Sequence, residues 1–392
     1  MKSWMTKPLG EVLEISRERI EPTEHPDTPF NYVGLESIEG HTGRLLQYQP
    51  TPGAEIKSTK NVFHNGEILY GKLRPYLNKV HLAGGDGICS TDIYVLRPRN
   101  RQIHPSFAAN FLRSPAVLSA VSNAMAGANL PRIGQEALLD IPVPVPPLAE
   151  QERIMKLLDG ADELRKLRAQ ADRRTAVLIP ALFHEMFGDP ERNSRGWPSA
   201  TFGEIITSTK LGLVRGAKET DDSLPFPYVR MDAILGNGNL ALVPIKRVNA
   251  TATEVAEFSL RAGDFLFNTR NSRELVGKTA LFEGGGTYLF NNNIMRIRFN
   301  GSIEPCFMIA LFQTDFIQRQ LEARKSGTTS VVAIYFKNLH NLKVIVPPLA
   351  LQNEFAQRVT EIRELEAGQA TSRTRLDALF QSMLHRAFNG DI

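Results

Sequence analysis

The sequence predicts an α+β protein built as a pseudo-two-fold tandem repeat, in which two mixed α/β domains are joined by two long antiparallel helices that form a coiled coil. Three observations predict this fold. A proline-rich hinge occurs twice in the 392 residues, short strand and helix patterns alternate before each hinge, and a long helical pattern follows each hinge. A chain of this length is also expected to form two or three domains.

The repeat extends over most of the chain. The hinge "IPVPVPPLAEQERI" at residues 141–154 corresponds to "LKVIVPPLALQNEF" at residues 342–355. Upstream of the hinges, "NGEILYGKLR" corresponds to "AGDFLFNTRN", which pairs Gly66 with Gly263 and Tyr70 with Phe267. "STDIYVLRP" likewise corresponds to "NNNIMRIRF". Two copies of one unit are therefore expected.

Each copy divides into a globular part and a long helix. The runs "EILYGKL", "DIYVLRP", "DFLFNTR" and "NIMRIRF" are typical of strands, and "PSFAANFLRSPAVLSAVSNAM" and "PCFMIALFQTDFIQRQLEAR" are typical of helices. The predicted boundaries are 1–146 and 189–346 for the globular domains, and 147–188 and 347–392 for the helices.

A seven-residue spacing of apolar residues supports a two-helix coiled coil with a polar middle at Arg168 and Gln369. Pro180 lies inside the first helical pattern, so we expect a kink or an early end near Ile179. The alternative is two separate amphipathic helices, each packed on its own domain. The residues expected to pack between the helices are Ile154, Leu157, Leu164, Leu178, Phe355, Ile362, Leu365 and Leu379.

Composition limits the possible functions. The net charge of +4 permits a polyanionic partner without requiring one. The positions of Cys89 and Cys306 do not fit the spacing of metal ligands. We therefore expect two reduced, buried thiols in a cytoplasmic protein. We find no signal peptide and no apolar run long enough to span a bilayer.

Two motifs could carry catalysis, but both are incomplete. "PD" at residues 26–27 with "EIK" at residues 55–57 has the spacing of a metal-dependent nuclease site, yet the second copy has no counterpart. "SRELVGKT" at residues 272–279 ends like a phosphate-binding loop, but Ser272 replaces its first glycine. We therefore expect no catalysis by this chain, and we interpret Lys278 as a lysine placed to touch a backbone phosphate.

The run "IPVPVPPLAEQERIMKLLDGADEL" resembles the conserved region of type I restriction–modification specificity subunits (HsdS), and the similarity covers nearly the whole chain. The second hinge departs from the pattern, because Leu351 stands where the first hinge has Glu150. The resemblance implies two target-recognition domains on two conserved helices. It also implies a cytoplasmic, non-catalytic subunit that reads double-stranded DNA and needs no cofactor of its own.

The resemblance further implies protein partners. Two modification subunits would use S-adenosylmethionine to methylate adenine at N6, and restriction subunits would supply a motor nuclease with ATP and Mg²⁺. Duplex DNA has local two-fold axes, so two similar domains can face two half-sites about one helical turn apart. Because the copies differ in sequence, we expect a bipartite, asymmetric site with an unspecified gap set by the helix pair.

Polar loops of the two recognition domains are the expected DNA contacts. Arginine favours guanine edges, asparagine favours adenine, and lysine more often contacts phosphates. Ordinary solvated loop residues are the competing interpretation for each position. The candidates are Lys72, Arg74, Tyr76, Asn129 and Arg132 in the first copy, and Arg270, Asn271, Arg273, Lys278, Lys325, Thr328 and Thr329 in the second.

Two other classes of protein stay open at this point. A self-contained nuclease or nucleotide hydrolase would require one of the incomplete motifs to be functional. A purely structural coiled-coil adaptor would not need two large and divergent globular parts. The tandem repeat, the long helices and the lack of complete catalytic motifs together favour a DNA-recognition scaffold.

Overall fold

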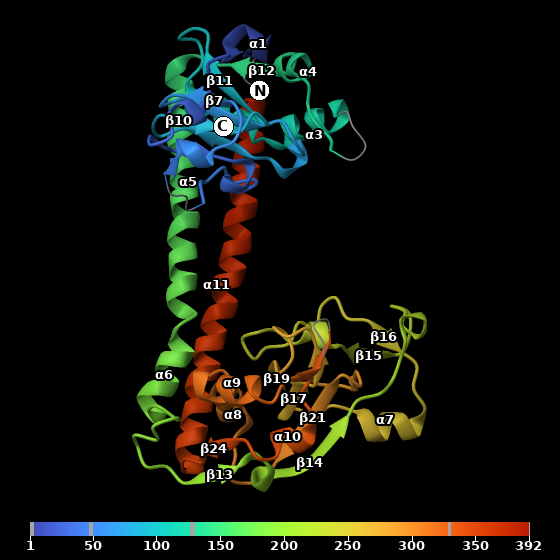
Figure 1. The fold of residues 1–392 in the computed structure, drawn as a ribbon. Coiled ribbons are helices and arrows are strands. Elements are labelled where there is room, and N and C mark those ends of the chain that lie inside the picture. The colour runs from blue at the N-terminus through green and yellow to red at the C-terminus, as the bar shows by residue number, and fades with distance from the viewer. Residues whose placement is uncertain (1–3, 47–49, 126–129, 328–330, 392) are drawn as a thin grey trace. The chain divides into compact units, whose positions relative to one another are not determined.

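The computed structural model describes residues 4–46, 50–125, 130–327 and 331–391. The chain forms two compact units, and each is described by itself (Figure 1). The first unit comprises residues 1–170 and 370–392, and the second comprises residues 171–369. The last long helix is continuous from one unit into the other, so each unit contains parts of both hinge helices.

Two four-stranded sheets form the centre of the first unit, in the orders β2-β11-β8-β9 and β3-β7-β10-β5. The strand β8 (Ile68–Gly71) is buried along its whole length because its residues are almost all apolar. Two ribbons, β1-β12 and β4-β6, complete the unit. The other strands are β1 (Met5–Pro8), β2 (Leu13–Ile15), β3 (Arg19–Ile20), β4 (Pro29–Phe30), β5 (Tyr32–Val33), β6 (Thr51–Pro52), β7 (Lys60–Phe63), β9 (Val80–Leu82), β10 (Gly87–Cys89), β11 (Ile93–Pro98) and β12 (Pro142–Val145).

The second unit has a four-stranded sheet in the order β14-β21-β17-β19, two three-stranded sheets, β16-β15-β20 and β18-β23-β22, and the ribbon β13-β24. Phenylalanines fill its core, and Phe265, Phe267 and Phe312 are buried together. The strands are β13 (Ser199–Thr201), β14 (Ile206–Leu211), β15 (Phe226–Val229), β16 (Arg247–Val248), β17 (Asp264–Asn268), β18 (Arg270–Asn271), β19 (Thr279–Phe282), β20 (Leu289–Phe290), β21 (Ile294–Phe299), β22 (Ser326–Gly327), β23 (Val332–Ala333) and β24 (Lys343–Ile345).

The strand order repeats between the units. The order β2-β11-β8-β9 corresponds to β14-β21-β17-β19, and the parallel pair β5-β10 corresponds to β15-β20. The four predicted strands are present as β8, β11, β17 and β21. The predicted tandem repeat of α+β units is therefore confirmed.

Short helices cover the sheets at equivalent places in the two units. Proline at the first helical position costs no hydrogen bond, and both α2 (Pro105–Leu112) and α8 (Pro305–Phe312) begin in this way. A break at a Ser114 or Thr314 N-cap separates each from the next helix. The remaining short helices are α1 (Leu9–Val12), α3 (Pro115–Ala124), α4 (Gln135–Leu139), α7 (Ala252–Phe258), α9 (Asp315–Glu322) and α10 (Phe336–Leu339).

The hinge helices are α5 (Leu148–Thr175), α6 (Leu178–Phe187) and α11 (Leu349–Asn389). Pro180 explains why the first hinge region has two helices and the second only one. Proline has no backbone N–H to donate to the carbonyl of Ala176, and its ring would clash with that carbonyl. The helix is therefore interrupted between Thr175 and Leu178. The predicted interruption is confirmed, and it lies just before the expected position.

A buried glutamine fixes each hinge. The Gln151 side chain accepts a hydrogen bond from His104 N at 2.8 Å and donates to Gln102 O and Pro146 O, both at 2.8 Å. Gln352 repeats this set with Glu304 N, Ser302 O and Pro347 O at 2.9, 3.0 and 2.7 Å. Both glutamines are fully buried. The glutamine shared by "PPLAEQ" and "PPLALQ" thus ties each hinge helix to the start of α2 or α8.

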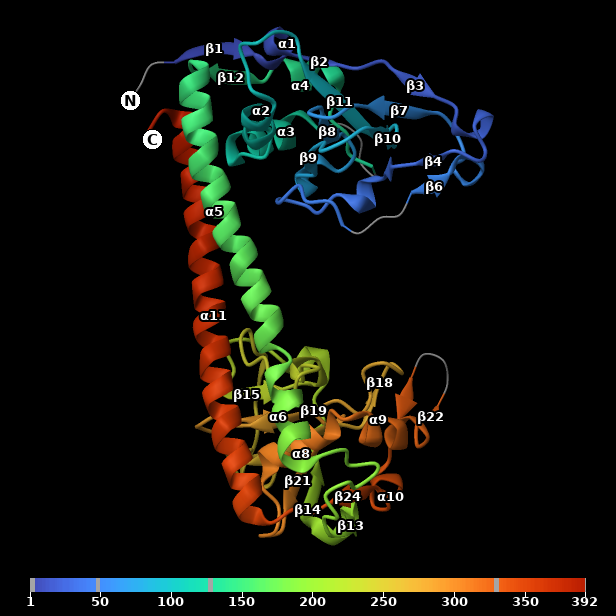
Figure 2. The same ribbon diagram turned by 90° about the vertical axis from the view of Figure 1, so that its left-hand side faces the viewer.

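The hinge helices run antiparallel within each unit. In the first unit α5 lies beside the C-terminal part of α11 (Figure 2), where Arg165 Nε donates to Asp377 Oδ1 at 2.8 Å and the guanidinium lies over the Phe380 ring. In the second unit Gln369 Nε2 donates to Thr175 Oγ1 at 2.9 Å, and Phe187 packs on Phe355. The middle of the helix pair is therefore polar, and its ends are apolar.

The apolar contacts of the helices differ from the predicted seam. Ile154 and Phe355 are buried and Ile362 is partly buried, but five predicted leucines are between 40% and 51% exposed. In the first unit the buried stripe instead contains Ile154, Met155, Leu158 and Ala161. The reason is that α5 packs on its own recognition domain as well as on α11, which shifts the buried face by about one residue. The leucines to which this correction applies are Leu157, Leu164, Leu178, Leu365 and Leu379.

Candidate nucleic-acid interface

Two separate segments form the candidate interface of the first unit. Leu73 makes an antiparallel bridge to Arg132, and Arg74 N donates to Pro131 O at 2.8 Å. Residues far apart in the sequence are thereby brought side by side. Of the predicted DNA contacts, this arrangement gathers Lys72, Arg74 and Arg132, with Tyr76 in the adjoining turn.

The side chains of this cluster differ in how firmly they are held. The Lys72 ammonium lies 5.2 Å from the centre of the Tyr94 ring, and Arg132 Nε is 3.6 Å from Asp92 Oδ1. Arg74 is exposed and has a left-handed backbone, with φ of 48°, which is uncommon for a residue other than glycine. Tyr76 is 43% exposed. Arg74 and Tyr76 are thus presented to solvent by a fixed turn that begins at Pro75.

The candidate interface of the second unit is the three-stranded sheet β18-β23-β22. Arg270 pairs with Ala333 and Asn271 pairs with Val332. Arg270 is exposed, whereas Asn271 is partly buried and its Oδ1 accepts a hydrogen bond from Ser272 N at 2.9 Å. These two side chains therefore lie at the edge of a sheet that is built from two distant parts of the chain.

Other predicted cations of the second unit are engaged within the protein. Arg273 forms an ion pair with Glu322, and Lys325 Nζ lies 2.8 Å from Glu322 Oε2 and donates to Arg273 O at 2.6 Å. Lys278 is partly buried beside β19, and its backbone carbonyl accepts a hydrogen bond from Asn268 N. Residues 277–279 lead into the strand β19 and not into a helix, so no phosphate-binding loop is formed.

The same backbone frame presents the candidate residues in both units. Ile133 N donates to Lys72 O at 3.1 Å, and Ile334 N donates to Thr269 O at 2.9 Å. The frame thus places Arg74 at the position that Asn271 has in the second unit. Two equivalent sites carry different side chains.

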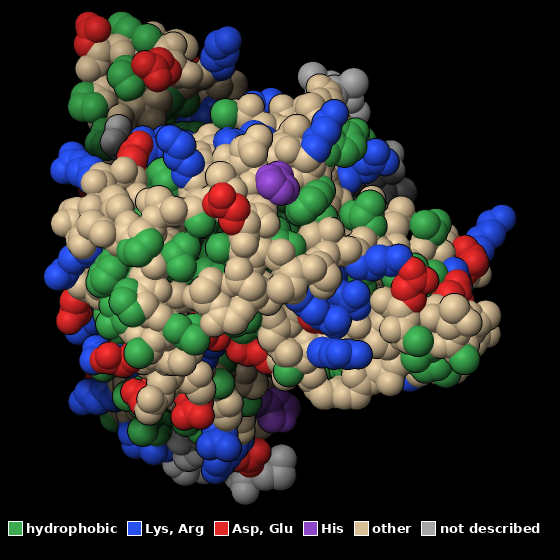
Figure 3. Space-filling model, turned by 90° about the horizontal axis from the view of Figure 1, so that it is seen from below, with side chains coloured by type: hydrophobic (Ala, Val, Ile, Leu, Met, Phe, Trp, Pro, Cys, Tyr) green, Lys and Arg blue, Asp and Glu red, His purple; other side chains and the backbone are tan. Residues whose placement is uncertain are grey.

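Three predicted contacts cannot be placed. Asn129, Thr328 and Thr329 lie outside the described residues. Lys79, the counterpart of Lys278, donates to Leu35 O at 2.6 Å and therefore has a structural partner. On the face shown in Figure 3, lysines and arginines are interspersed with acidic side chains and form no continuous basic track.

Sequence reasoning missed an arginine cluster in the first unit. Arg44, on a loop, reaches the helix α5 and lies 2.9 Å from Asp162 Oδ1. Burial acts to raise the pKa of Asp162, but Arg44 and Lys166 hold it below its usual range. In the sequence, the polar residues in the middle of the predicted helix seam were the one feature that pointed to this cluster. The cluster lines a cavity of about 120 Å³ and comprises Arg44, Arg165, Arg168 and Arg373.

The described residues offer little support for other kinds of site. Among them no three His, Cys, Asp or Glu side chains are grouped so that they could hold a metal ion. Asp27 and Glu55, from the incomplete nuclease motif, lie in neighbouring exposed turns in which Ala54 N donates to Pro26 O at 3.1 Å. No helix in the described part of the chain has the length and hydropathy needed to cross a membrane.

Comparison with known proteins gives consistent matches. A family model for the type I restriction modification DNA specificity domain matches residues 1–172 and again residues 195–371. The specificity subunit of the type I restriction enzyme EcoDI from Escherichia coli is 36% identical over 189 residues, which are 47% of this chain and 41% of that protein. The EcoKI specificity subunit from Escherichia coli strain K12 is 26% identical over 317 residues, 76% of this chain and 68% of that protein.

A solved structure supports the fold. A chain from a study of complex assembly and conformational transition in the type I R-M system aligns with a TM-score of 0.66 and 24% identity. The alignment covers 99% of this chain and 98% of that one. The two-unit architecture is therefore shared with that chain over its whole length.

Proposed function

This chain belongs to the family of type I restriction–modification DNA specificity domains, and from that premise we propose that it is the subunit that reads DNA sequence in a type I restriction–modification complex. It matches less than half the length of the EcoDI relative, so the activity and partners of the whole assembly are part of the proposal. The proposed role is recognition without catalysis by the chain itself, with S-adenosylmethionine, ATP and Mg²⁺ bound by partner subunits.

The observation that carries the proposal is the repeated frame of the two candidate interfaces. The bridge Leu73–Arg132 and the pairing Arg270–Ala333 hold equivalent backbones, and they present different polar side chains. Arginine makes bidentate contacts with guanine, and asparagine makes them with adenine. Each unit therefore reads one half of a bipartite, asymmetric site.

The hinge helices would set the gap between the half-sites. The helix α11 has 41 residues, and at a rise of 1.5 Å per residue this is about 60 Å of continuous helix. Inserting one heptad into both hinge regions is expected to widen the unspecified gap. An unchanged gap in the methylated motif, measured by single-molecule sequencing, would contradict this role of the helices.

Exposed leucines of the helices supply a docking surface for two modification subunits, and a motor-nuclease subunit would complete the complex. In the first unit Leu157, Leu164 and Leu167 are 40%, 51% and 52% exposed along α5. Exposed apolar side chains on one helix are a common feature of protein interfaces. Leu164→Glu is expected to weaken co-purification with the modification subunit, and Lys156→Glu, at an exposed position of the same helix, serves as the control.

Half-site reading can be tested residue by residue. We expect Arg74→Ala to relax the methylated motif in one half only and Arg270→Ala to relax it in the other half only. Each lost base contact corresponds to about 1–3 kcal/mol of discrimination. Exposed arginines outside the candidate interfaces, Arg101 and Arg261, provide matched Ala controls.

The methylated adenines of a host genome, mapped by single-molecule sequencing with the modification subunits present, give the readout. If both variants altered the same half, or if neither altered the motif, the proposed assignment would be wrong. Cleavage of DNA or hydrolysis of ATP by the isolated chain with Mg²⁺ would contradict the non-catalytic role.

A further inference from the structure

The two units differ where a surface loop meets the hinge helices. The loop of residues 39–44 in the first unit corresponds to the loop of residues 235–239 in the second, because the bridges Ile38–Leu45 and Ile234–Leu240 close them. Gly43 and Gly238 both have positive φ, 69° and 85°. Each glycine approaches the C-cap of the adjacent helix, Arg113 on α2 or Gln313 on α8.

In the first unit two arginines fill this junction. Arg44 reaches from the loop to Asp162 of α5 at 2.9 Å. Arg113 donates to Thr42 O and, at 2.8 Å, to Asn110 Oδ1. Burial lowers the pKa of the Arg113 guanidinium, as expected for a cation enclosed in the fold. The first unit thus narrows its own junction with cationic side chains, and the cavity that Arg44 lines there has a volume of about 120 Å³.

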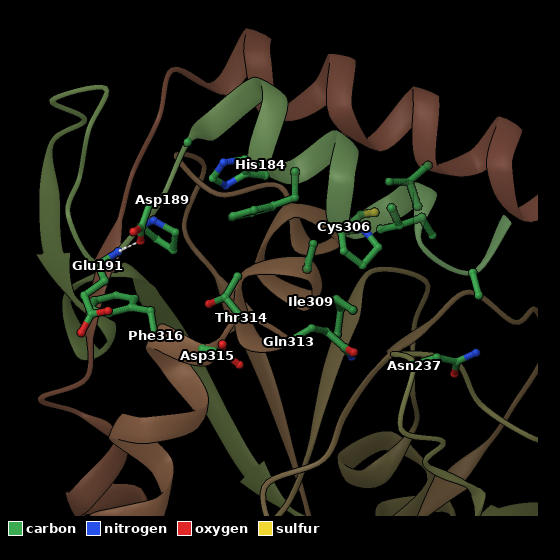
Figure 4. Close-up of a pocket in the computed structure, with 18 of the residues that line it drawn as sticks. His184, Asp189, Glu191, Asn237, Cys306, Ile309, Gln313, Thr314, Asp315 and Phe316 are labelled. Atoms are coloured by element: carbon green, nitrogen blue, oxygen red, sulfur yellow. Dashed lines mark hydrogen bonds between the residues drawn. The ribbon is translucent and has the colours of Figure 1, made fainter. Parts of the chain in front are cut away.

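In the second unit the same junction is open. Asn239 stands where Arg44 stands, and Gln313 replaces Arg113. With its amide turned so that both groups are satisfied, Gln313 donates to Gly236 O at 3.0 Å and accepts from Gly238 N at 3.1 Å. Arg363 replaces Asp162 and pairs with Glu283 at 2.8 Å. A cavity of about 500 Å³ is left between α6, α8, α9 and α11 (Figure 4).

The floor of the cavity is apolar. It contains Ile179 and Phe183 from α6 and Ile309 and Ala310 from α8. Figure 4 shows Ile309, Gln313, Thr314 and Asp315 along one wall, opposite α6. Such a surface suits the aliphatic stem of a long side chain or a neighbouring apolar residue.

The rim of the cavity is acidic. Asp189, Glu191, Asp315 and Glu366 line it, against two arginines, Arg319 and Arg363. Both arginines are already paired, Arg319 with Glu191 at 2.6 Å and Arg363 with Glu283. Within the described residues, Asp315 and Glu366 have no ion-pair or hydrogen-bond partner for their carboxylates. The rim therefore offers two unpaired negative charges.

We propose that this cavity of the second unit is a docking site for a partner polypeptide, which inserts an arginine beside an apolar side chain. The occupant fills the space that the side chains of the second unit leave between α6, α8, α9 and α11. Its guanidinium pairs with Asp315 and Glu366, and its apolar neighbour packs on Phe183 and Ile309. The proposal does not depend on which DNA sequence the chain reads.

The test uses the full-length chain and a defined probe, N-acetyl-leucyl-arginine amide. Its neutral analogue, N-acetyl-leucyl-citrulline amide, has nearly the same shape without the charge. Methyl-labelled isoleucine gives a local readout by NMR, because Ile179 and Ile309 line the cavity and the buried Ile154 of the first unit does not. We expect saturable shifts of the first two methyls with a Kd of about 1–10 mM, and weaker binding of the citrulline peptide.

Substitutions make the test specific. Glu366→Gln and Asp315→Asn are each expected to weaken arginine-peptide binding about threefold. Glu364→Gln, on an exposed position of the same helix outside the cavity, should leave it unchanged. Asn239→Arg combined with Arg363→Asp installs the pair of the first unit and should abolish binding.

Two kinds of result would contradict the proposal. Equal affinity for the arginine and citrulline peptides, or binding that both carboxylate substitutions leave intact, would overturn the proposed cationic occupant. Absence of saturable shifts at Ile179 and Ile309 up to tens of millimolar peptide would overturn the docking site itself.

Discussion

The two units attach their hinge helices with the same glutamine but fasten the neighbouring loop differently. Gln151 and Gln352 make equivalent sets of hydrogen bonds to the hinge and to the residues before α2 and α8. Beside them, the first unit closes its loop on the helix with Arg44, and the second leaves Asn239 at the edge of an open cavity. The backbone frame is thus repeated, while the side chains around it have diverged.

This difference indicates which contacts are required by the fold and which can vary with function. A buried glutamine that satisfies three backbone groups has few substitutes, because any loss leaves polar atoms unpaired. A loop side chain at the surface can change with little cost to stability. Divergence at the candidate interface and at the junction is therefore compatible with one conserved architecture.

The chain provides its own probes for comparing the units. It contains two tryptophans, of which Trp4 packs in the core of the first unit and Trp197 in that of the second. Replacing either one by phenylalanine leaves a fluorescence signal from a single unit. Urea unfolding of the two single-tryptophan proteins then measures each unit separately, as the predictions below require.

The largest expected difference concerns a buried ion pair. In the second unit Arg298 contacts both oxygens of the nearly fully buried Asp264, at 2.6 and 3.1 Å. In the first unit the equivalent Arg97 is 4.0 Å from Glu67 and pairs with the partly exposed Glu14 at 3.1 Å. Arg298→Ala is expected to destabilise the second unit by about 3–4 kcal/mol, because it leaves a buried carboxylate unpaired. Arg97→Ala should cost the first unit about 1 kcal/mol or less. Equal losses in the two Trp signals would contradict this contrast.

The hinge glutamines should behave alike. Gln151→Ala and Gln352→Ala each leave one backbone N–H and two backbone carbonyls without their side-chain partner, so a loss of about 2–3 kcal/mol is expected in the corresponding unit. Exposed glutamines on the same helices, Gln170 and Gln357, provide Ala controls. A loss confined to one unit would show that the two hinges are not equivalent.

The loop attachment should have a smaller effect. Arg44→Asn removes the partly exposed pair with Asp162 and is expected to cost the first unit about 0.5–1 kcal/mol. Asn239→Ala, at the equivalent position, should change the second unit by less than about 0.5 kcal/mol. The comparison would be wrong if Asn239→Ala destabilised its unit as much as Arg44→Asn does.

The smallest expected effect depends on pH. Glu304 caps α8 in the second unit, where burial raises the pKa of its carboxyl, while His104 caps α2 in the first. A raised pKa means that the folded unit favours the protonated acid. Its stabilising contribution is present below the ordinary glutamate pKa of about 4.3 and is lost as pH rises through the folded-state pKa. Relative to Glu304→Gln, the native second unit should lose stability as pH rises above about 4.3. A difference that did not change with pH would contradict this.

Several elements could be predicted from residues alone. The strands β8, β11, β17 and β21 follow from short apolar runs, and the helix interruption follows from Pro180. The packing face of the helices could not be predicted in the same way. Leu157 and Leu158 are adjacent and equally apolar, yet only Leu158 is buried, because α5 packs on two neighbours at once.

The candidate interface could be predicted only in part. Exposed residues such as Arg74 and Arg270 were indicated by polar loops. Lys325 lies only three residues after Glu322, so that ion pair is local. The pairing of Arg273 with Glu322 was not indicated, since these two residues are distant in the sequence. The arginine cluster around Arg44 was missed for the same reason, because its members come from a loop and two helices.

The sequence by itself determined the tandem repeat, the order of domain and helix, and the position of each hinge, because these depend on local propensity and on periodicity along the chain. The tertiary structure alone decided which apolar face is buried, which cations are already paired, and where one unit is closed and the other open. Those properties depend on contacts between distant residues. The contact of Arg44 with Asp162, and the absence of its counterpart at Asn239 among the described residues, are properties of the folded chain.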